Sequence, residues 1–390
     1  MTLRARSWDE ADSSISLKQT KKMKIGIDIR STLKKKRTGI GNYTLGLIKA
    51  LALADSDNSY FLYSRIRPFD LKKNVCPLPG RNFRHRIERL SFFPERAMKD
   101  MDIFHTSSYD IPAPGTYRLF TTVHDLVPLF FEEGYSGDYL RDYRDIMERV
   151  LRESSVVITD SENTRDDVRE KFPGLARRVE VVYPGVDISF TAPDNGISRA
   201  RVKKKYGLEG RYALYSGGMD PRKNLTRLVE AFRVMKSRIK APCKLLITGE
   251  KAKFPSDAGK KITEYSLADD IVFTGYVGSE DLKRLYAAAD VFVYPSLYEG
   301  FGLPILEAFA MGTPVVTSST SSCGEIASGA AVTVDPLDSD ALAEALYNVV
   351  SDKDLAAHLK ERGKERAEHF SWEKSAGKLL DLFRESAPEK

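Results

Sequence analysis

Short apolar runs that alternate with longer amphipathic segments, in two successive series, constrain the fold of this chain more than any other feature. The first series extends from a strand at 24–30 to a strand at 179–183, and the second extends from a strand at 212–216 to a helix at 372–386. Strands that alternate with helices form parallel sheets covered on both faces. The pattern therefore predicts two Rossmann-like α/β domains, with a ligand cleft between the carboxyl ends of their strands.

The two series also suggest where the chain divides. Residues 1–22 are polar and charged without an apolar core, so we expect a disordered leader and no signal peptide. The first domain is expected at 23–190 and the second at 191–371, because a break rich in turn-forming residues occupies 187–197. A C-terminal helix completes the chain at 372–390.

Composition excludes several classes of protein. Of the 390 residues, 42% are hydrophobic and 30% are charged, which is typical of a globular chain and not of a disordered one. The widely spaced Cys76, Cys243 and Cys323 fit neither a disulfide framework nor a zinc site, and they indicate a reducing cytosol. A net charge of +6 is too small to argue for a nucleic-acid partner. No run approaches the ~18 apolar residues of a spanning helix, so any membrane contact would be peripheral.

One stretch, residues 65–99, is unusually basic, with ten Lys or Arg residues against three Asp or Glu residues. The same stretch contains Phe69, Phe83, Phe92 and Phe93. Cations mixed with aromatic side chains suit the surface of an anionic membrane or another polyanion. A solvated basic face explains the composition equally well, so both interpretations stay open.

The most informative segment is residues 294–314, YPSLYEGFGLPILEAFAMGTP. A buried strand ends here, and a helix is expected to begin near Leu303 because Pro304 suits a first helical turn. Gly300 and Gly302 allow the backbone to approach a ligand closely. Free amides at a helix N-terminus bind anions, and a diphosphate is the natural occupant.

Two carboxylates flank this predicted anion site. Glu299 precedes the glycines and Glu307 lies one turn into the helix. Carboxylates accept pairs of hydroxyl donors, which suits a sugar or a ribose diol. The alternative is a plain turn in which Glu307 is a structural acid. The functional interpretation is favoured because the two glycines, the proline and both acids occur together at this spacing.

A second candidate loop is Ser216–Asn224, with the sequence SGGMDPRKN between a strand and a helix. Gly217 permits close backbone approach, while Arg222 and Lys223 bring positive charge to the same cleft. Fixed cations stabilise the charge that grows on a departing diphosphate. A solvated basic helix start is the alternative.

Weaker signals lie elsewhere in the chain. Gly39 and Gly41 form a short glycine motif after the first strand, and the basic run 34–37 before it is an anion contact, a flap or a solvated loop. His124 ends an apolar strand and is expected to face the cleft, although a single His is usually only packed or exposed. The string 338–340 is expected to open a helix and not to bind a metal.

The segment from Glu299 to Glu307 resembles the E-x7-E signature of GT-B glycosyltransferases, specifically retaining family 4. The resemblance covers most of the chain from Met23. The segment PSLYEGFGLPILEAFAMGTPVVTSS is most similar to the bacterial and archaeal mannosyltransferase branch. It implies that Glu299 contacts donor-sugar hydroxyls and that Glu307 holds the nucleotide ribose. It also implies that backbone amides meet the sugar and the β-phosphate, those of Gly300, Phe301, Gly302 and Leu303.

The resemblance assigns further residues. Lys223 matches the family lysine, while Gly218 stands where many members have an arginine, which leaves Arg222 as a substitute. Gly39 and Gly41 resemble the glycine loop that lines the donor phosphates. His124 matches the family H-D motif, whose His contacts the donor sugar, and Tyr276 lies where the family seats the base. The expected catalytic residues are therefore His124, Lys223 and Glu299.

The same resemblance implies a GT-B fold with an acceptor-side first domain, a nucleotide-sugar-binding second domain and a last helix that packs back on the first. It implies transfer of a hexose with retention and without a metal or other cofactor. The expected donor is GDP-mannose, and the expected acceptor is a lipid-linked saccharide or polysaccharide. We expect a cytoplasmic protein, with peripheral attachment to the inner face of the cell membrane as a further hypothesis.

Three alternatives stay open from the sequence. One is a glucosyl or GlcNAc transferase that uses a UDP-sugar. Another is a GT-B nucleotide-sugar epimerase, which would need no acceptor. The third is a non-catalytic sugar- or anion-binding protein, against which the intact set of His124, Lys223, Glu299 and Glu307 argues.

Overall fold

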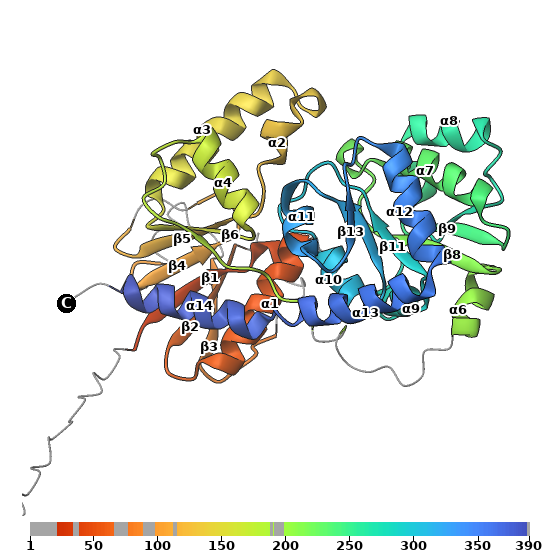
Figure 1. The fold of residues 1–390 in the computed structure, drawn as a ribbon. Coiled ribbons are helices and arrows are strands. Elements are labelled where there is room, and N and C mark those ends of the chain that lie inside the picture. The colour runs from red at the N-terminus through yellow and green to blue at the C-terminus, as the bar shows by residue number, and fades with distance from the viewer. Residues whose placement is uncertain are drawn as a thin grey trace, which may run out of the picture.

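Two α/β domains lie side by side in the structure, a computed structural model (Figure 1). The residues that the structure describes are 22–33, 39–65, 77–88, 98–111, 115–187, 190 and 199–387. Each domain is built on one sheet whose paired strands are all parallel, as the alternating sequence predicts.

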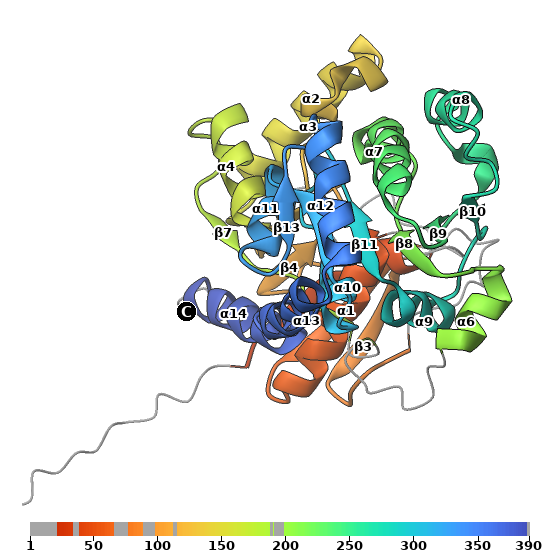
Figure 2. The same ribbon diagram turned by 45° about the vertical axis from the view of Figure 1, so that its right-hand side comes forward.

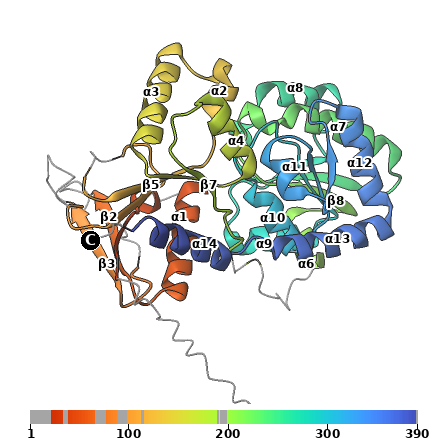
Figure 3. The ribbon, with the colours of Figure 1, turned by 60° about the vertical axis from the view of Figure 1, so that its left-hand side comes forward.

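The first domain contains a seven-stranded sheet. Helices cover both of its faces: α1 (Gly39–Ala54) and α14 (Trp372–Glu385) lie on one, and α3 (Gly137–Glu153) and α4 (Glu162–Lys171) lie on the other (Figure 3). The strands in spatial order are β3 (Phe83–Glu88), β2 (Ser59–Arg65), β1 (Lys24–Asp28), β4 (Ile103–Thr106), β5 (Arg118–Val123), β6 (Val156–Thr159) and β7 (Val179–Val181).

The second domain contains a six-stranded sheet, in the spatial order β10 (Ile271–Phe273), β9 (Cys243–Ile247), β8 (Arg211–Tyr215), β11 (Val291–Tyr294), β12 (Val315–Ser318) and β13 (Val332–Val334). One helical layer holds α7 (Leu225–Arg238), α8 (Ser256–Glu264) and α12 (Ser339–Ser351) (Figure 2). The other layer holds α6 (Arg199–Tyr206), α9 (Ser279–Ala288), α10 (Leu303–Ala310) and α13 (Lys353–Ala367). A short helix, α11 (Ser321–Ala327), follows β12 and approaches α4 of the first domain.

Helix starts follow the side chains that the sequence offers as caps. Ser161 accepts a hydrogen bond from the amide of Thr164 and begins α4. Asp338 accepts from the amides of Asp340 and Ala341 and begins α12, which confirms that the string 338–340 opens a helix.

The C-terminal helix α14 leaves the second domain and packs on the first (Figure 1). Leu379, Leu380 and Phe383 are buried in the same core as the strands of the first sheet. At the crossing point Trp372 fills space beside Gly46, where an added Cβ would lie 2.3 Å from the indole. The glycine is therefore required for the close approach of α1 and α14.

The edge strand β3 falls within the basic stretch 65–99. Phe83 is 2% exposed and stacks on Tyr60 at a centroid distance of 4.5 Å, so it belongs to the core and is removed from the expected membrane-facing set. Residues Phe69, Phe92 and Phe93 lie outside the described residues. Among the helices that the structure describes, none has the length and apolar character needed to cross a membrane.

Candidate active site

Two loops of the second domain meet because the strands before them are neighbours. β8 and β11 pair in parallel, so the chain leaves both strands at the same edge of the sheet. The loop after β8 enters the short helix η5 (Pro221–Lys223), and the loop after β11 enters α10. A hydrogen bond of 2.7 Å from the amide of Leu297 to the carbonyl of Arg222 joins the loops.

A buried ion cluster of Arg222, Lys223 and Glu299 lies between these loops. Lys223 is 5% exposed and Glu299 is 7% exposed. The Lys223 ammonium pairs with Oε1 of Glu299 and donates to the hydroxyl of Tyr294 at 2.8 Å. A guanidinium nitrogen of Arg222 lies 2.7 Å from Oε2 of Glu299, and its Nε lies 2.9 Å from the half-exposed Asp220. In the buried part of the cluster, two cations therefore face one carboxylate.

The two cations determine the ionisation of Glu299. Burial by itself raises the pKa of a carboxyl group, but Lys223 and Arg222 outweigh it and hold the pKa of Glu299 below its usual value. The backbone of Glu299 is fixed on both sides, because its amide donates to Ser321 at 3.2 Å and its carbonyl accepts from Ser322 at 2.8 Å. Glu299 is thus a positioned carboxylate at neutral pH, suited to accepting hydroxyl donors.

Helix α10 begins at Leu303, as the sequence predicts. Gly302 precedes it with φ of 110°, a left-handed conformation that favours glycine. Pro304 lies in the first turn, where a missing amide proton costs nothing. The neighbouring Phe301 points its ring into the core beside Phe370, at a centroid distance of 5.8 Å, and is 6% exposed. The start of α10 therefore has the geometry of an anion-binding helix terminus next to the ion cluster.

Glu307 lies in the second turn of α10. Its Oε2 accepts a hydrogen bond of 3.0 Å from the hydroxyl of Tyr286. Burial raises the pKa of Glu307 to about 7, with a further increase from the charge of Asp187, although the hydrogen bond from Tyr286 opposes both. Glu307 therefore titrates close to neutral pH.

His124 forms a buried pair with Asp160. Nδ1 of His124 lies 2.6 Å from Oδ2 of Asp160, and no group of the described residues bonds its buried Nε2. Burial alone lowers the pKa of His124, but the Asp160 carboxylate outweighs it and raises that pKa. The sequence contained a signal for this pair, because His124 and Asp160 each directly follow a short apolar run. In the structure these runs are the neighbouring strands β5 and β6, in which Val123 pairs with Thr159.

The first domain contacts the loop that carries Glu299. The carbonyl of Gly300 accepts hydrogen bonds from the hydroxyls of Ser161 at 2.7 Å and Thr164 at 3.1 Å. A Cβ placed on Gly300 would lie only 1.9 Å from the carbonyl oxygen of His124. The glycine at this position is therefore required for the approach of the two domains, and it brings the His124 strand end against the predicted donor loop.

A second contact between the domains centres on Glu325 of α11. Its carboxylate accepts from the amides of Glu162 and Asn163, at 2.9 and 3.0 Å, at the N-terminus of α4. It also accepts from the hydroxyl of Tyr183 at 2.7 Å. A carboxylate at a helix N-terminus is favoured by the free amides and by the helix dipole, so Glu325 stabilises the observed arrangement of the domains.

The glycine motif of the first domain lies against the His124 pair. Gly39 and Gly41 form the first turn of α1, and Tyr43 packs edge-on against the His124 ring at a centroid distance of 4.8 Å. The basic run 34–37 lies outside the described residues.

Two other predicted donor contacts have different surroundings. Gly217 is the second residue after β8, and an added Cβ would lie 2.9 Å from the hydroxyl of Tyr215, so a side chain here would disturb the base of the loop. Tyr276 follows β10, two strands from β8 in the sheet, and is 76% exposed. Tyr276 therefore lies at the same edge of the sheet as the ion cluster, but it follows a strand that is not a neighbour of β8.

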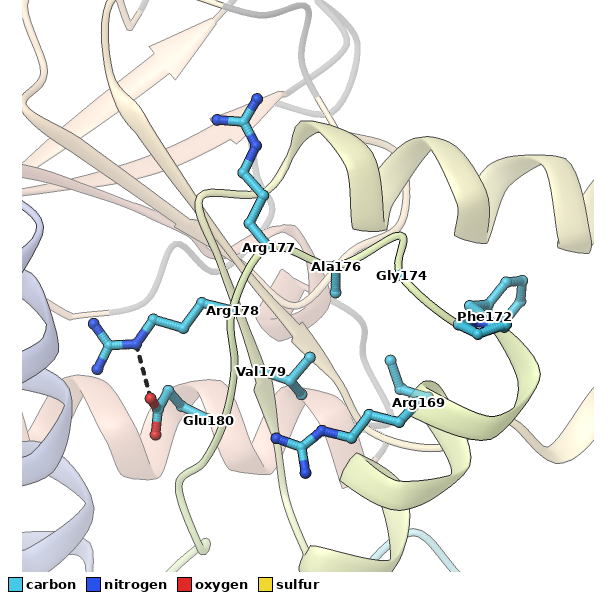
Figure 4. A pocket seen from close by; sticks show the side chains of 10 residues that line it. Arg169, Phe172, Gly174, Ala176, Arg177, Arg178, Val179 and Glu180 are labelled. Carbon is cyan, nitrogen blue, oxygen red and sulfur yellow. Dashed lines mark hydrogen bonds and ion pairs between the residues drawn. The ribbon is translucent and has the colours of Figure 1, made fainter.

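A hollow of about 520 Å³ lies elsewhere, at the end of α4 and the start of β7 (Figure 4). Arg169, Arg177 and Arg178 line it, but their guanidinium groups point in different directions. Arg178 is already paired with Glu180 at 2.7 Å. These cations do not converge on one point, and the hollow shares no residue with the ion cluster.

Two sequence profiles match the chain. The profile of Glycosyl transferases group 1 matches residues 198–366, and that of Glycosyltransferase Family 4 matches residues 37–190. A curated relative, the O-antigen chain mannosyltransferase B of Escherichia coli, is 30% identical over 374 residues that cover 89% of this chain and 96% of that protein. The chain belongs to the family 4 glycosyltransferases.

This glycosyltransferase also resembles more distant proteins. The mannosylfructose-phosphate synthase of Agrobacterium fabrum is 29% identical over 242 residues, which cover 60% of this chain and 53% of that protein. Sucrose-phosphate synthase from Thermosynechococcus elongatus superposes with a TM-score of 0.72 at 22% identity, over 93% of this chain and 99% of that one. HepE of Anabaena, in complex with UDP and glucose, has a TM-score of 0.72 at 17% identity, over 93% of this chain and all of the other. The predicted GT-B fold is confirmed.

Proposed function

We propose that this glycosyltransferase moves mannose from GDP-mannose to a hydroxyl group of a saccharide, with retention of configuration and without a metal or other cofactor. The observation that carries the proposal is the buried cluster of Lys223, Arg222 and Glu299 beside the start of α10. Relatives from Escherichia coli named as mannosyltransferases support mannose as the sugar. The name of one refers to the O-antigen chain, which supports a lipid-linked saccharide or polysaccharide as the acceptor.

In this proposal each group of the site has a separate task. The amides of 300–303 and the cations Lys223 and Arg222 bind the diphosphate. Glu299, once a phosphate competes for its cations, accepts hydroxyl groups of the sugar. Glu307 accepts the ribose diol, and His124 contacts the sugar from the first domain.

The transfer step needs charge stabilisation more than a covalent catalyst. The bond from C1 of mannose to the phosphate oxygen breaks, and its electron pair stays on the departing GDP. The acceptor oxygen bonds to C1 on the same face, and its proton passes to the departing phosphate. Lys223 and Arg222 stabilise the negative charge that grows on that phosphate in a site that excludes water.

The proposal is tested by Lys223→Ala measured beside Lys260→Ala, whose side chain on α8 is 78% exposed. With GDP-mannose and a mannose oligosaccharide, Lys223→Ala should lower kcat by about 10²–10³. Lys260→Ala should match the wild type, and both variants should remain folded because Arg222 still neutralises Glu299. Near-normal turnover by Lys223→Ala, or a β-configured product in the anomeric NMR spectrum, would contradict the proposal.

The choice of donor has its own test. A nucleotide sugar that binds only the folded state raises the Tm, and at equal concentration a tighter ligand raises it more. GDP-mannose should raise the Tm more than UDP-glucose or UDP-GlcNAc at equal concentration. A larger shift with a UDP-sugar would replace the proposed donor, and a free epimer formed from donor alone would indicate an epimerase.

Peripheral attachment to an anionic membrane is proposed for the basic stretch 65–99. Its described part includes Arg84 and Arg86 on the edge strand β3, although Arg86 is paired with Asp100 at 2.9 Å. Co-sedimentation with vesicles should increase with their content of anionic lipid. Binding that is independent of that content would remove the proposal.

A further inference from the structure

Three tyrosines stack in a row at the start of α3. The rings of Tyr135 and Tyr139 are 5.0 Å apart with 13° between their planes, and those of Tyr139 and Tyr143 are 6.3 Å apart with 17°. Tyr143 is buried, but Tyr135 is 37% exposed and Tyr139 is 47% exposed. Exposed aromatic side chains in an ordered stack indicate a surface used for binding, because their apolar faces cost free energy in water.

The row extends from the candidate active site to the surface. The hydroxyls of Tyr143 and Tyr109 both donate to the carbonyl of Asp125, the residue after His124, at 3.4 Å. Near the other end, Phe130 and Phe131 pack against Tyr298, the residue before Glu299, at ring-centroid distances of 4.7 and 6.3 Å.

Tyr135 therefore follows, four residues after Phe131, a contact with the loop of the second domain that carries Glu299. Tyr135 directly follows the 3-10 helix η4 (Glu132–Gly134) and precedes the first residue of α3. This segment follows α2 (Val127–Phe130) on the side of the first domain that faces the second (Figure 1).

The stacking of Tyr139 on one face of the Tyr135 ring leaves Tyr135 37% exposed. The C–H groups on one side of a hexose ring are weakly positive and apolar, and they pack on the negative face of an aromatic ring. We propose that Tyr135, supported by Tyr139, forms a subsite for a hexose ring of the acceptor saccharide, which rests on the proposed function.

The charges around the row favour a neutral saccharide over an anionic membrane. Helix α3 carries five acidic and four basic residues in its sequence GDYLRDYRDIMERVLRE. Its arginines are paired locally, as in the ion pairs of Arg149 with Glu153 and of Arg152 with Glu148. A surface with this balance lacks the excess of cations that an anionic lipid surface attracts.

The test measures binding of an α-linked mannotriose to the GDP-bound protein by saturation-transfer NMR. Tyr135→Ala should weaken binding about tenfold, while Tyr135→Phe, which keeps the ring, should bind like the wild type. Ile146→Ala is the control, because Ile146 is 43% exposed on the same helix but outside the stack. GDP binding should be unchanged in all three variants.

The outcomes separate this inference from the proposed function. A wild type that neither binds GDP nor hydrolyses GDP-mannose would refute the proposed function. Normal GDP binding, with mannotriose bound equally by wild type and Tyr135→Ala or by neither, would overturn only the subsite. Loss of binding to vesicles of phosphatidylglycerol in Tyr135→Ala, with mannotriose binding intact, would overturn it in favour of a membrane contact.

Discussion

Replacing Gly300 by alanine tests whether the observed contact between the domains is the arrangement in which the enzyme works. The new Cβ would lie 1.9 Å from the carbonyl oxygen of His124, and real Cβ atoms keep at least 3.0 Å from such atoms. The loop and the His124 strand end must therefore separate by about 1.1 Å. Both partners are backbone, so no side-chain rotation relieves the overlap. Misplacement of reacting groups by about 1 Å costs on the order of 10²-fold in rate.

The assay compares kcat, GDP affinity and Tm for Gly300→Ala and Gly259→Ala. Gly259 lies in α8, and an added Cβ there would meet no atom within 4 Å. We expect Gly300→Ala to lose about 10²-fold in kcat, while its GDP affinity stays within about threefold, because most of the proposed diphosphate contacts belong to the second domain. Gly259→Ala should match the wild type. A kcat for Gly300→Ala within about threefold of the wild type would show that turnover needs no such contact between His124 and this loop.

Three further predictions concern Asp160, Glu307 and Glu325. Because the pKa of His124 is raised in the folded protein, protonated His124 stabilises the fold below about pH 6.5, and this contribution is lost as the pH rises through the folded pKa. Asp160→Asn should abolish this part of the dependence of Tm on pH. An unchanged dependence would contradict the pairing of His124 with Asp160. With a Glu307 pKa of about 7, the ionised acceptor forms as the pH rises, so GDP affinity by calorimetry should increase by up to about tenfold from pH 6 to 8. That increase should be missing in Glu307→Gln. Glu325→Ala should lower the free energy of unfolding by about 1–2 kcal/mol in denaturant titrations, and Glu325→Gln, which keeps one acceptor oxygen, should lose less.

The sequence predicts the elements that follow from local patterns. The two α/β series, the start of α10 at Leu303 and the helix that opens at 338–340 each depend on neighbouring residues, and the structure contains all of them. The two loops with Arg222 and Glu299 were expected in one cleft because both follow strands of the same domain.

Features that depend on distant partners were missed. Strand β3 has the sequence FRHRIE and was interpreted as part of a basic stretch, because an edge strand exposes its charged side chains. The pair of His124 with Asp160 joins residues 36 positions apart, so only the register of β5 and β6 brings them together. The approach of Gly300 to His124 depends on how two domains meet, which no pattern within either domain determines.

A crystal structure of the protein with GDP tests the central claim most directly. We predict a β-phosphate within hydrogen-bonding distance of both the Lys223 ammonium and a backbone amide of residues 300–303, with the ribose hydroxyls on Glu307. Phosphates bound at another place, with Lys223 still paired only to Glu299 and Tyr294, would contradict the account.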